Sequence, residues 1–315
     1  MKNKLKVLIT GCGGDIGQSI GKILKSKSEL FSLVIGADLH EEHAGKFIFD
    51  ACFVLPRCNA DGYQKAVIQL IKDHQIDVVI PISEPELRNL GKHLYHDDFF
   101  NKPVIMANWQ SLHVGFDKKL TSDFLANHGL PFPDTQLVKS YNKSIFPVLI
   151  KSRDGSGSKS IHLVNSREEL DLYQKIFPEF IAQEFLSNDG GEYTCGLFRS
   201  TSGEIRDIIL KRKLMGGFSG YGTREENHQI SKLLHQIANL LDLNGSINVQ
   251  LKLVHGIPVI FEINPRFSST VLFRHLMGFE DVLWSIQDKL GLELDSYQIN
   301  HSINNFYKGF SEYVD

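Results

Sequence analysis

The chain has 315 residues, 42% hydrophobic and 23% charged, a composition that is ordinary for a globular protein and sufficient for two or three compact units. Its formal net charge of -3, and the lack of any apolar run near the roughly 18 to 20 residues of a membrane span, argue against nucleic acid and membranes as partners. The four cysteines are too sparse for a disulfide framework and lack the paired spacing of metal sites, so a reducing cytoplasm is the expected location.

The first 110 residues alternate between short apolar segments and helical segments. Strands are predicted at Lys6–Thr10, Leu33–Ala37, Asp77–Pro81 and Val104–Met106, and helices at Ile16–Lys27, Tyr63–His74 and Glu86–Tyr95. This alternation is typical of a parallel sheet with helices on both faces. An α/β domain is therefore expected here.

The turn after the first predicted strand is rich in glycine. The spacing of Gly11, Gly14 and Gly17 resembles the nucleotide turn of short-chain dehydrogenases and sugar epimerases, and Asp38 lies where a ribose-binding acid is expected. Those enzymes also use a Tyr-x-x-x-Lys pair, and no tyrosine here has a lysine four residues on. Because glycine also suits close packing of a helix on a strand, a nicotinamide-dependent sugar-modifying enzyme is an alternative only.

The rest of the chain is predicted to be α+β. A helix over Asp117–His128 leads into strands near Val148–Lys151 and Lys159–Val164. A single further sheet is predicted from strands at Phe180–Leu186, Glu192–Arg199, Glu204–Lys213, Ser246–Val254 and Pro258–Asn264, with helices near Glu225–Leu241 and Val282–Leu290.

A loop rich in glycine and serine follows Lys151. Backbone N–H groups near Gly155 and Gly157, with the hydroxyls of Ser156 and Ser158, suit phosphate oxygens, and the lysine would offset their charge. The residue order is not that of a Walker loop, and a strand rather than a helix follows. A plain flexible hairpin fits the same residues.

The segment 259–266 carries polar side chains on an apolar strand. Glu262 and Asn264 are two residues apart, so their side chains point to the same face. The preceding strand would place Asn248 and Gln250 beside them. Oxygen donors of this kind suit Mg²⁺, which takes one or two carboxylates and completes its shell with phosphates and water. A polar strand face with a chance acid is the ordinary alternative.

The ordered set of these motifs resembles the ATP-grasp superfamily over essentially the whole chain, most closely the single-module relatives of the carbamoyl-phosphate synthase large subunit. The set comprises the Gly-rich turn, Asp77–Pro81, Asp117–Lys118, Lys151 with its Gly/Ser loop, Gln183–Phe185, Glu192, Lys211–Arg212, Gln250 and Glu262–Arg266. The resemblance implies a Rossmann-like, parallel-sheet pre-ATP-grasp domain at 1–110. It also implies a two-lobed ATP-grasp fold, with a small lobe or lid at 111–182 and a large lobe bearing the metal site at 183–315.

The same resemblance implies roles for individual residues. The implied nucleotide-binding residues are Lys118, Lys151, Gly155, Ser156, Gly157, Ser158, Gln183, Glu184, Phe185, Leu186 and Glu192. Within this set the lysines and the loop would contact the ATP phosphates, residues 184–186 would line the adenine site, and Glu192 would hold the ribose. The implied ligands of Mg²⁺, or of Mn²⁺ in its place, are Gln250, Glu262 and Asn264. The implied catalytic residues are Lys151, Arg212 and Arg266, the last steadying the transferred phosphoryl group.

The expected reaction is phosphoryl transfer from ATP to a small-molecule carboxylate, followed by attack of an amine on the acyl phosphate. Carbamoyl phosphate synthesis itself is not expected, because the chain has one ATP-grasp module. The glycine-rich segment 211–224 is predicted as a mobile loop near the acceptor, with Arg212 a better contact than Arg224, although a surface loop fits it too. A homodimer is a further expectation. A kinase that stops at a phosphorylated product and a non-catalytic nucleotide sensor stay open as alternatives, and a complete metal site speaks against the sensor.

Overall fold

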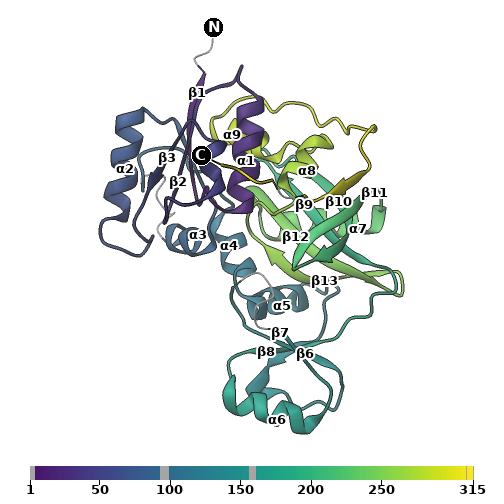
Figure 1. Cartoon of the computed structure of the whole chain (residues 1–315). Helices are drawn as coiled ribbons and strands as arrows, with labels where there is room; N and C mark the ends of the chain where they lie inside the picture. Colours follow the sequence, from purple (N-terminus) through teal and green to yellow (C-terminus); the bar gives the residue numbers. More distant parts are fainter. Residues whose placement is uncertain (1–3, 93–98, 156–160, 310, 315) are drawn as a thin grey trace.

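The computed structural model describes residues 4–92, 99–155, 161–309 and 311–314. Within these ranges the strands form a four-stranded sheet, a six-stranded sheet and a second four-stranded sheet (Figure 1). The first is parallel and the other two are antiparallel, which confirms the predicted α/β part followed by an α+β part. None of the helices in the described ranges has the length and apolar character needed to cross a bilayer.

The parallel sheet has the strand order β3-β2-β1-β4. Its elements are β1 (Leu5–Thr10), α1 (Asp15–Ser26), β2 (Phe31–Asp38), β3 (Ala51–Val54), α2 (Tyr63–His74), β4 (Val78–Pro81) and α3 (Glu84–Gly91). The sequence does not predict β3, because its four residues are only partly buried and lack an apolar repeat. The predicted helix at Glu86–Tyr95 corresponds to α3, and residues 93–98 lie outside the described ranges.

Both faces of the parallel sheet are covered. One face packs against α1 and against two helices from the far end of the chain, α8 (Val271–Leu276) and α9 (Asp281–Lys289). The other face packs against α2. Successive residues of β1 show the division, because Val7 belongs to the first core and Leu8 to the second. The C-terminal part of the chain therefore returns to the N-terminal sheet (Figure 1).

The smaller antiparallel sheet has the order β5-β8-β6-β7 and packs against α6. Its elements are β5 (Thr135–Leu137), β6 (Val148–Lys151), β7 (Ile161–Val164), α6 (Arg167–Ile176) and β8 (Ile181–Glu184). The prediction that residues 180–186 join the large sheet is wrong. Strand β8 pairs with β5 and β6 because its apolar residues, including Ala182, are buried in the small core beneath α6.

The large sheet has the order β13-β12-β9-β10-β11-β14. Its strands are β9 (Glu192–Arg199), β10 (Ile205–Met215), β11 (Phe218–Glu225), β12 (Gly245–Val254), β13 (Ile257–Asn264) and β14 (Asn305–Tyr307). Helices α5 (Lys118–Asn127) and α7 (His228–Leu240) contribute to the core on one of its faces.

The segment 211–224 forms part of a hairpin rather than the predicted loop. Strands β10 and β11 pair in antiparallel register from Ile209 to Met215. The turn consists of Gly216 and Gly217, with φ of 58° and 86°, a conformation that two-residue hairpin turns require and that glycine adopts at no steric cost. The glycines of this segment therefore belong to a tight turn, Gly216 and Gly217, and to strand β11, Gly220 and Gly222.

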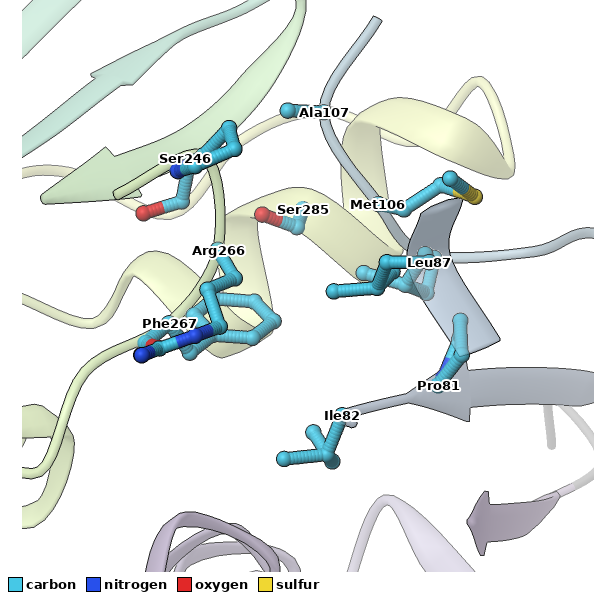
Figure 2. A pocket seen from close by; sticks show the side chains of 11 residues that line it. Pro81, Ile82, Leu87, Met106, Ala107, Ser246, Arg266, Phe267 and Ser285 are labelled. Carbon is cyan, nitrogen blue, oxygen red and sulfur yellow. The ribbon is translucent and has the colours of Figure 1, made fainter. Parts of the chain in front are cut away.

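The parallel sheet and the segment after β13 are in contact, with little space left between them. Arg266 and Phe267, after β13, line a small cavity together with Pro81, the last residue of β4, and Ile82 (Figure 2). The cavity between them has a volume of about 10 Å³, room for about one water molecule. Ile82 and Phe267 belong to one buried core with residues of the parallel sheet, so the segment after β13 packs against that sheet.

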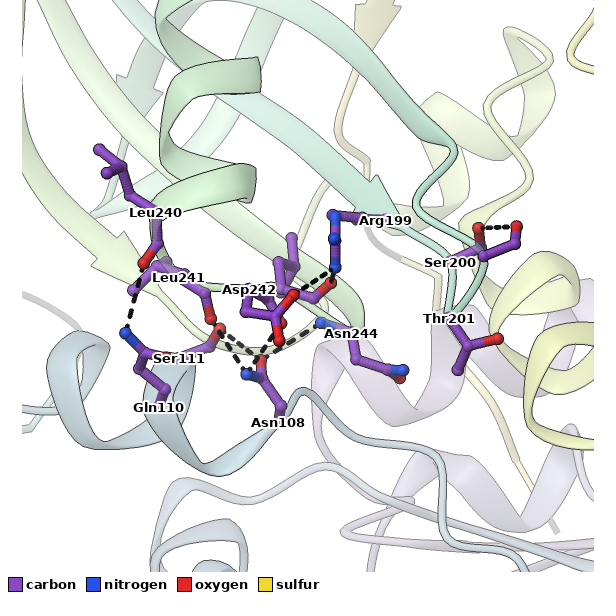
Figure 3. Close-up of polar contacts among 12 residues, drawn as sticks. Asn108, Gln110, Ser111, Arg199, Ser200, Thr201, Leu240, Leu241, Asp242 and Asn244 are labelled. Atoms are coloured by element: carbon purple, nitrogen blue, oxygen red, sulfur yellow. Dashed lines mark hydrogen bonds and ion pairs between the residues drawn. The ribbon is translucent and has the colours of Figure 1, made fainter.

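A polar joint at Asn108 reinforces this arrangement. Its side-chain amide donates to the carbonyl oxygens of Leu241 and Asp242, at 3.1 Å each, and its side-chain oxygen accepts from the backbone N–H of Asn244 (Figure 3). Asn108 immediately precedes α4 (Trp109–Gly115), so the joint ties that helix to the turn between α7 and β12. Gln110 adds a bond to the carbonyl of Leu240 at 3.3 Å.

Candidate active site

Strands β12 and β13 present the oxygen donors expected from the sequence on adjacent positions. In the antiparallel register Asn248 lies opposite Asn264, and Gln250 lies opposite Glu262. A register irregularity follows Gln250, so the pairing shifts beyond the polar positions. The sequence therefore predicts the neighbours of Glu262 correctly.

Helix α5 delivers Lys118 to the same place. Asp117 caps the helix by accepting from the backbone N–H of Lys119 and of Leu120, and it forms an ion pair with Arg153 at 2.5 Å. The Lys118 ammonium lies 3.6 Å from a Glu262 carboxylate oxygen and donates to the carbonyl of Gly155 at 2.8 Å. The start of α5, strand β13 and the segment after β6 thus meet at one ammonium group.

Lys151 brings a second cation to the cluster from the end of β6. Its side chain is 6% exposed, and burial lowers its pKa to about 8, with Glu262 acting against this shift and Lys118 adding to it. No direct ion pair of Lys151 occurs within the described ranges. A buried ammonium without a close counterion is a costly arrangement, and a bound anion would relieve it.

Glu262 is the carboxylate at the centre of these cations. Its side chain is 21% exposed. Burial raises the pKa of Glu262, but Lys118 and Lys151 outweigh that effect, and a hydrogen bond from Asn264 and the charge of Arg266 add to it, so the pKa lies below its usual value. Glu262 is therefore ionised at neutral pH and available as an oxygen ligand.

Arg212 on β10 connects the ribose candidate to the metal candidates. Its guanidinium donates to Glu192 at 3.0 and 2.8 Å, to the side-chain oxygen of Gln250 at 2.7 Å and to the hydroxyl of Ser219 at 3.2 Å. With a side chain 9% exposed, Arg212 is held in a fixed orientation by these bonds. Arg224, the weaker candidate in the sequence, pairs instead with the exposed Glu226.

A cavity of about 430 Å³ opens between the small sheet and the large sheet. Most of the predicted nucleotide residues line it, namely Lys118, Lys151, Gly155, Gln183, Glu184, Leu186 and Glu192, together with Arg212, Gln250 and Glu262. It also has an apolar lining that the sequence does not predict, formed by Leu149, Ile161, Leu214 and Phe261. The spacing of Leu149 and Lys151 in one strand is the signal that could have found the first of these.

Two of the predicted nucleotide-binding residues, Phe185 and Gln183, differ from the others in their surroundings. Phe185 is 44% exposed and is not among the residues that line the cavity in the described part of the chain; the Lys252 ammonium lies 5.8 Å from the centre of its ring. Gln183 is buried and donates to the Thr135 hydroxyl at 3.0 Å, so its amide is already engaged. Ser156, Gly157 and Ser158 lie outside the described ranges.

A second cavity, of about 510 Å³, adjoins the first. The two share Arg212, Leu214, Gln250 and Glu262. The second cavity also reaches Asn264 and Arg266 on one side and the N-terminal Gly-rich turn on the other. Its N-terminal side carries three acids, Asp15, Asp38 and Glu84, so the cavity is acidic toward the parallel sheet and cationic toward β10 and β13.

The residues of the Gly-rich turn and Asp38 make hydrogen bonds and packing contacts with one another. The carboxylate of Asp38 accepts from the backbone N–H of Gly13 and of Leu39, each at 2.7 Å, so both of its oxygens are engaged. A Cβ atom on Gly17 would lie 2.4 Å from the carbonyl oxygen of Gly11, which means that only glycine allows α1 to approach this closely. Packing thus accounts for the pattern that resembles a dinucleotide turn.

The chain forms a parallel sheet first and then two antiparallel sheets with a charged cavity between them. This is the arrangement expected of an ATP-grasp protein. Residues 116–270 match the ATP-grasp domain family, and residues 7–105 match the PylC-like N-terminal domain family. The chain is therefore a member of the ATP-grasp family that carries a PylC-like N-terminal domain.

The similar proteins agree with this assignment. A carbamoyl-phosphate synthase of Methanobrevibacter smithii is 28% identical over 145 residues, which are 44% of this chain and 38% of that protein, so the chain spans only part of this relative. The structure of N5-carboxyaminoimidazole ribonucleotide synthetase with ADP superposes with a TM-score of 0.72 at 18% identity, covering 94% of this chain and 79% of that one. An L-amino acid ligase from Bacillus licheniformis gives 0.71 at 19%, covering 92% and 75%. At these identities the superpositions show the fold.

Proposed function

We propose that the chain is an ATP-dependent carboxylate–amine ligase. The observation that carries this proposal is the position of Glu262, which two lysines surround at the boundary between two cavities. A triphosphate and an acceptor would meet at that boundary. Phosphoryl transfer requires positioning and neutralisation of charge more than a protein nucleophile, and this cluster offers both.

The nucleotide would occupy the first cavity. Its volume of about 430 Å³ falls within the range of small-molecule sites, and its apolar residues, such as Leu186 and Phe261, suit a base. Lys118 and Lys151 would contact the phosphates. Glu192 accepts from Arg212 and has room for ribose hydroxyls only on its remaining oxygen.

The residues that would hold Mg²⁺ are Glu262, Gln250 and Asn264. They fit this ion, because a single carboxylate with amide oxygens leaves the rest of the shell to phosphate and water, as Mg²⁺ prefers. The bound ion would supply stabilisation of the negative charge that develops on the phosphates. Arg212 orients the Gln250 amide through the bond at 2.7 Å.

The acceptor would occupy the second cavity. A substrate carboxylate suits the side with Arg212 and Arg266, and a substrate ammonium group suits the acidic side. One oxygen of Asp15 is buried with no hydrogen-bond partner in the described ranges, and its other oxygen accepts from Lys308. This layout favours a substrate that carries both a carboxylate and an amine.

The proposed reaction has two steps, transfer of a phosphoryl group and attack by an amine. A carboxylate oxygen attacks the γ-phosphorus, the bond from phosphorus to ADP breaks, and an acyl phosphate forms. An amine then attacks the acyl carbon, inorganic phosphate leaves, and the amine loses a proton. Arg266 lines the second cavity and would stay beside the transferred group. Burial lowers its pKa, and the charges of Glu84 and Glu262 oppose this shift.

The test is incubation with ATP, Mg²⁺ and pooled amino acids and small carboxylic acids, with ADP release measured and positive pools divided. Hydroxylamine in a parallel reaction traps an acyl phosphate as a hydroxamate. ADP release with a hydroxamate, replaced by an amide when an amine is added, is the expected result. A stable phosphorylated product would support the kinase alternative. Tight binding of NAD with no binding of ATP would overturn the proposal.

A further inference from the structure

Three potential metal ligands converge on the N-terminal sheet, outside both cavities. The Sγ atoms of Cys12 and Cys52 and a ring nitrogen of His43 all lie within 4.8 Å of one another. Cys12 belongs to the Gly-rich turn, Cys52 to β3, and His43 precedes a short 3-10 helix at Ala44–Phe47. The sequence does not predict this cluster, because the two cysteines are far apart along the chain.

Two glycines create the space for this cluster. Gly36 lies beside Cys52 in the parallel register of β2 and β3, and a Cβ atom on Gly36 would lie 2.7 Å from the Cys12 sulfur. A Cβ atom on Gly13 would lie 2.8 Å from the ring of His43. Glycine inside a strand is destabilising relative to alanine, and here the absent side chain of Gly36 allows two thiols to lie together.

The surroundings of the cluster are electronegative. Burial raises the pKa of both thiols, and the negative charge of Asp38 raises them further. The oxygens of Asp38 are engaged by backbone N–H groups, so this acid acts as a nearby charge rather than as a free ligand. A cation among the sulfurs would displace their protons and offset the charge.

We propose that Cys12, Cys52 and His43 bind a thiophilic cation of the Zn²⁺ type. The distance from Cys12 Sγ to His43 Nε2 is 3.7 Å. Tetrahedral bonds of about 2.3 Å to sulfur and about 2.0 Å to nitrogen require a separation of roughly 3.5 Å. The ion would link the Gly-rich turn to β3 and complete its shell with water.

The second ring nitrogen of His43 distinguishes this site from a closed structural zinc site. His43 Nδ1 is buried and has no hydrogen-bond partner in the described ranges. Metal-binding histidines usually donate this N–H, and losing such a partner commonly weakens affinity by about 10- to 100-fold. We therefore expect a reversible site that a chelator empties. A weak hydrogen bond between thiol and imidazole would span the same distance without any metal.

Titration with Co²⁺ of chelator-treated protein kept under reductant tests the proposal. The expected result is thiolate-to-cobalt charge-transfer absorption that saturates at one equivalent and disappears on addition of Zn²⁺. Cys12→Ser and Cys52→Ser should each abolish the absorption, and His43→Ala should weaken binding by at least about tenfold. Cys58→Ser is the matched control, because this half-buried thiol lies outside the cluster, and it should leave the absorption unchanged.

Circular dichroism establishes that each variant is folded, and His43→Gln provides a second variant if His43→Ala is not. Absence of the charge-transfer absorption in the wild-type protein would overturn the proposal. So would unchanged absorption in both Cys12→Ser and Cys52→Ser, or a Cys12–Cys52 disulfide in the reductant-treated protein.

Discussion

Two groups of paired charges in this molecule differ in the ratio of acids to cations. In the core, Arg274 and Asp281 are both fully buried and joined by two hydrogen bonds of 3.2 and 2.6 Å, and Ser246 donates a third to the carboxylate at 2.5 Å. In the cleft, Glu262 faces Lys118 across 3.6 Å, and Lys151 lies nearby with no direct ion pair in the described ranges.

The difference indicates which cluster serves folding and which awaits a ligand. Burial raises the pKa of Asp281 and lowers that of Arg274, and each charge opposes the shift of the other, so one acid and one cation neutralise each other in the core. Around Glu262 two cations outweigh the burial of one acid, and the excess positive charge faces a cavity. An incompletely neutralised group next to open volume is what an anion-binding site requires.

Removing one partner of the core pair should have the largest effect on stability. Asp281→Ala leaves the Arg274 guanidinium buried and unpaired, so the free energy of unfolding should fall by about 3–5 kcal/mol. Denaturant titration followed by circular dichroism measures this change. Asp171→Ala breaks an exposed pair with Arg167 and should cost at most about 0.5 kcal/mol. Similar losses in the two variants would contradict the proposed difference between the pairs.

Removing the carboxylate of the cleft should affect turnover and leave the fold intact. Glu262→Ala should lower the rate of ADP release by on the order of 10²-fold or more, because a charge-stabilising contact is lost. Its circular dichroism spectrum should match that of the wild type. Glu179→Gln, which removes an exposed acid between α6 and β8, is the control and should keep full activity. Normal turnover by Glu262→Ala would refute the metal assignment.

Titration of Lys151 should make nucleotide binding depend on pH. Its pKa of about 8 means that the ammonium is charged below pH 8 and neutral above it. Affinity for an ATP analogue should therefore be level below pH 8 and fall by up to about tenfold per unit above it. Calorimetry across this range measures the effect. Lys151→Arg stays charged and should flatten the profile; an unchanged profile in that variant would assign the titration to another group.

The polar joint should give the smallest change. Asn108→Ala removes side-chain hydrogen bonds to the α7–β12 turn, so the free energy of unfolding should fall by about 1–2 kcal/mol. Gln110→Ala removes one longer bond and should cost about 0.5 kcal/mol. Thermal unfolding distinguishes the two. A larger loss in Gln110→Ala would show that the joint is organised differently.

The sequence predicts the parts of the fold that local pattern determines. Alternation of strands and helices predicts the parallel sheet, and the two-residue spacing of Glu262 and Asn264 predicts their common face with Gln250 opposite. Pattern fails where tertiary contacts decide. Strand β8 joins the small sheet because of the core beneath α6, and the glycines at 216–217 form a hairpin turn, which composition alone does not distinguish from a loop.

The candidate site shows the same limit. The charged residues are predictable because their chemistry is visible in the sequence, whereas Leu149, Ile161 and Leu214 are ordinary apolar residues until the two sheets face each other across a cavity. The spacing of the cysteines likewise does not predict that Cys12 and Cys52 lie together, because the parallel register brings them together. The domain boundaries at 110 and 182 stay predictions.

The central claim is that the cavity between the small and large sheets holds the nucleotide. A crystal structure with Mg²⁺ and a non-hydrolysable ATP analogue tests it most directly. The expected result is density for the phosphates between Lys118, Lys151 and Glu262, with the base against Leu186 and Phe261. An empty cavity, with density for the analogue beside Gly11 and α1 instead, would contradict the account.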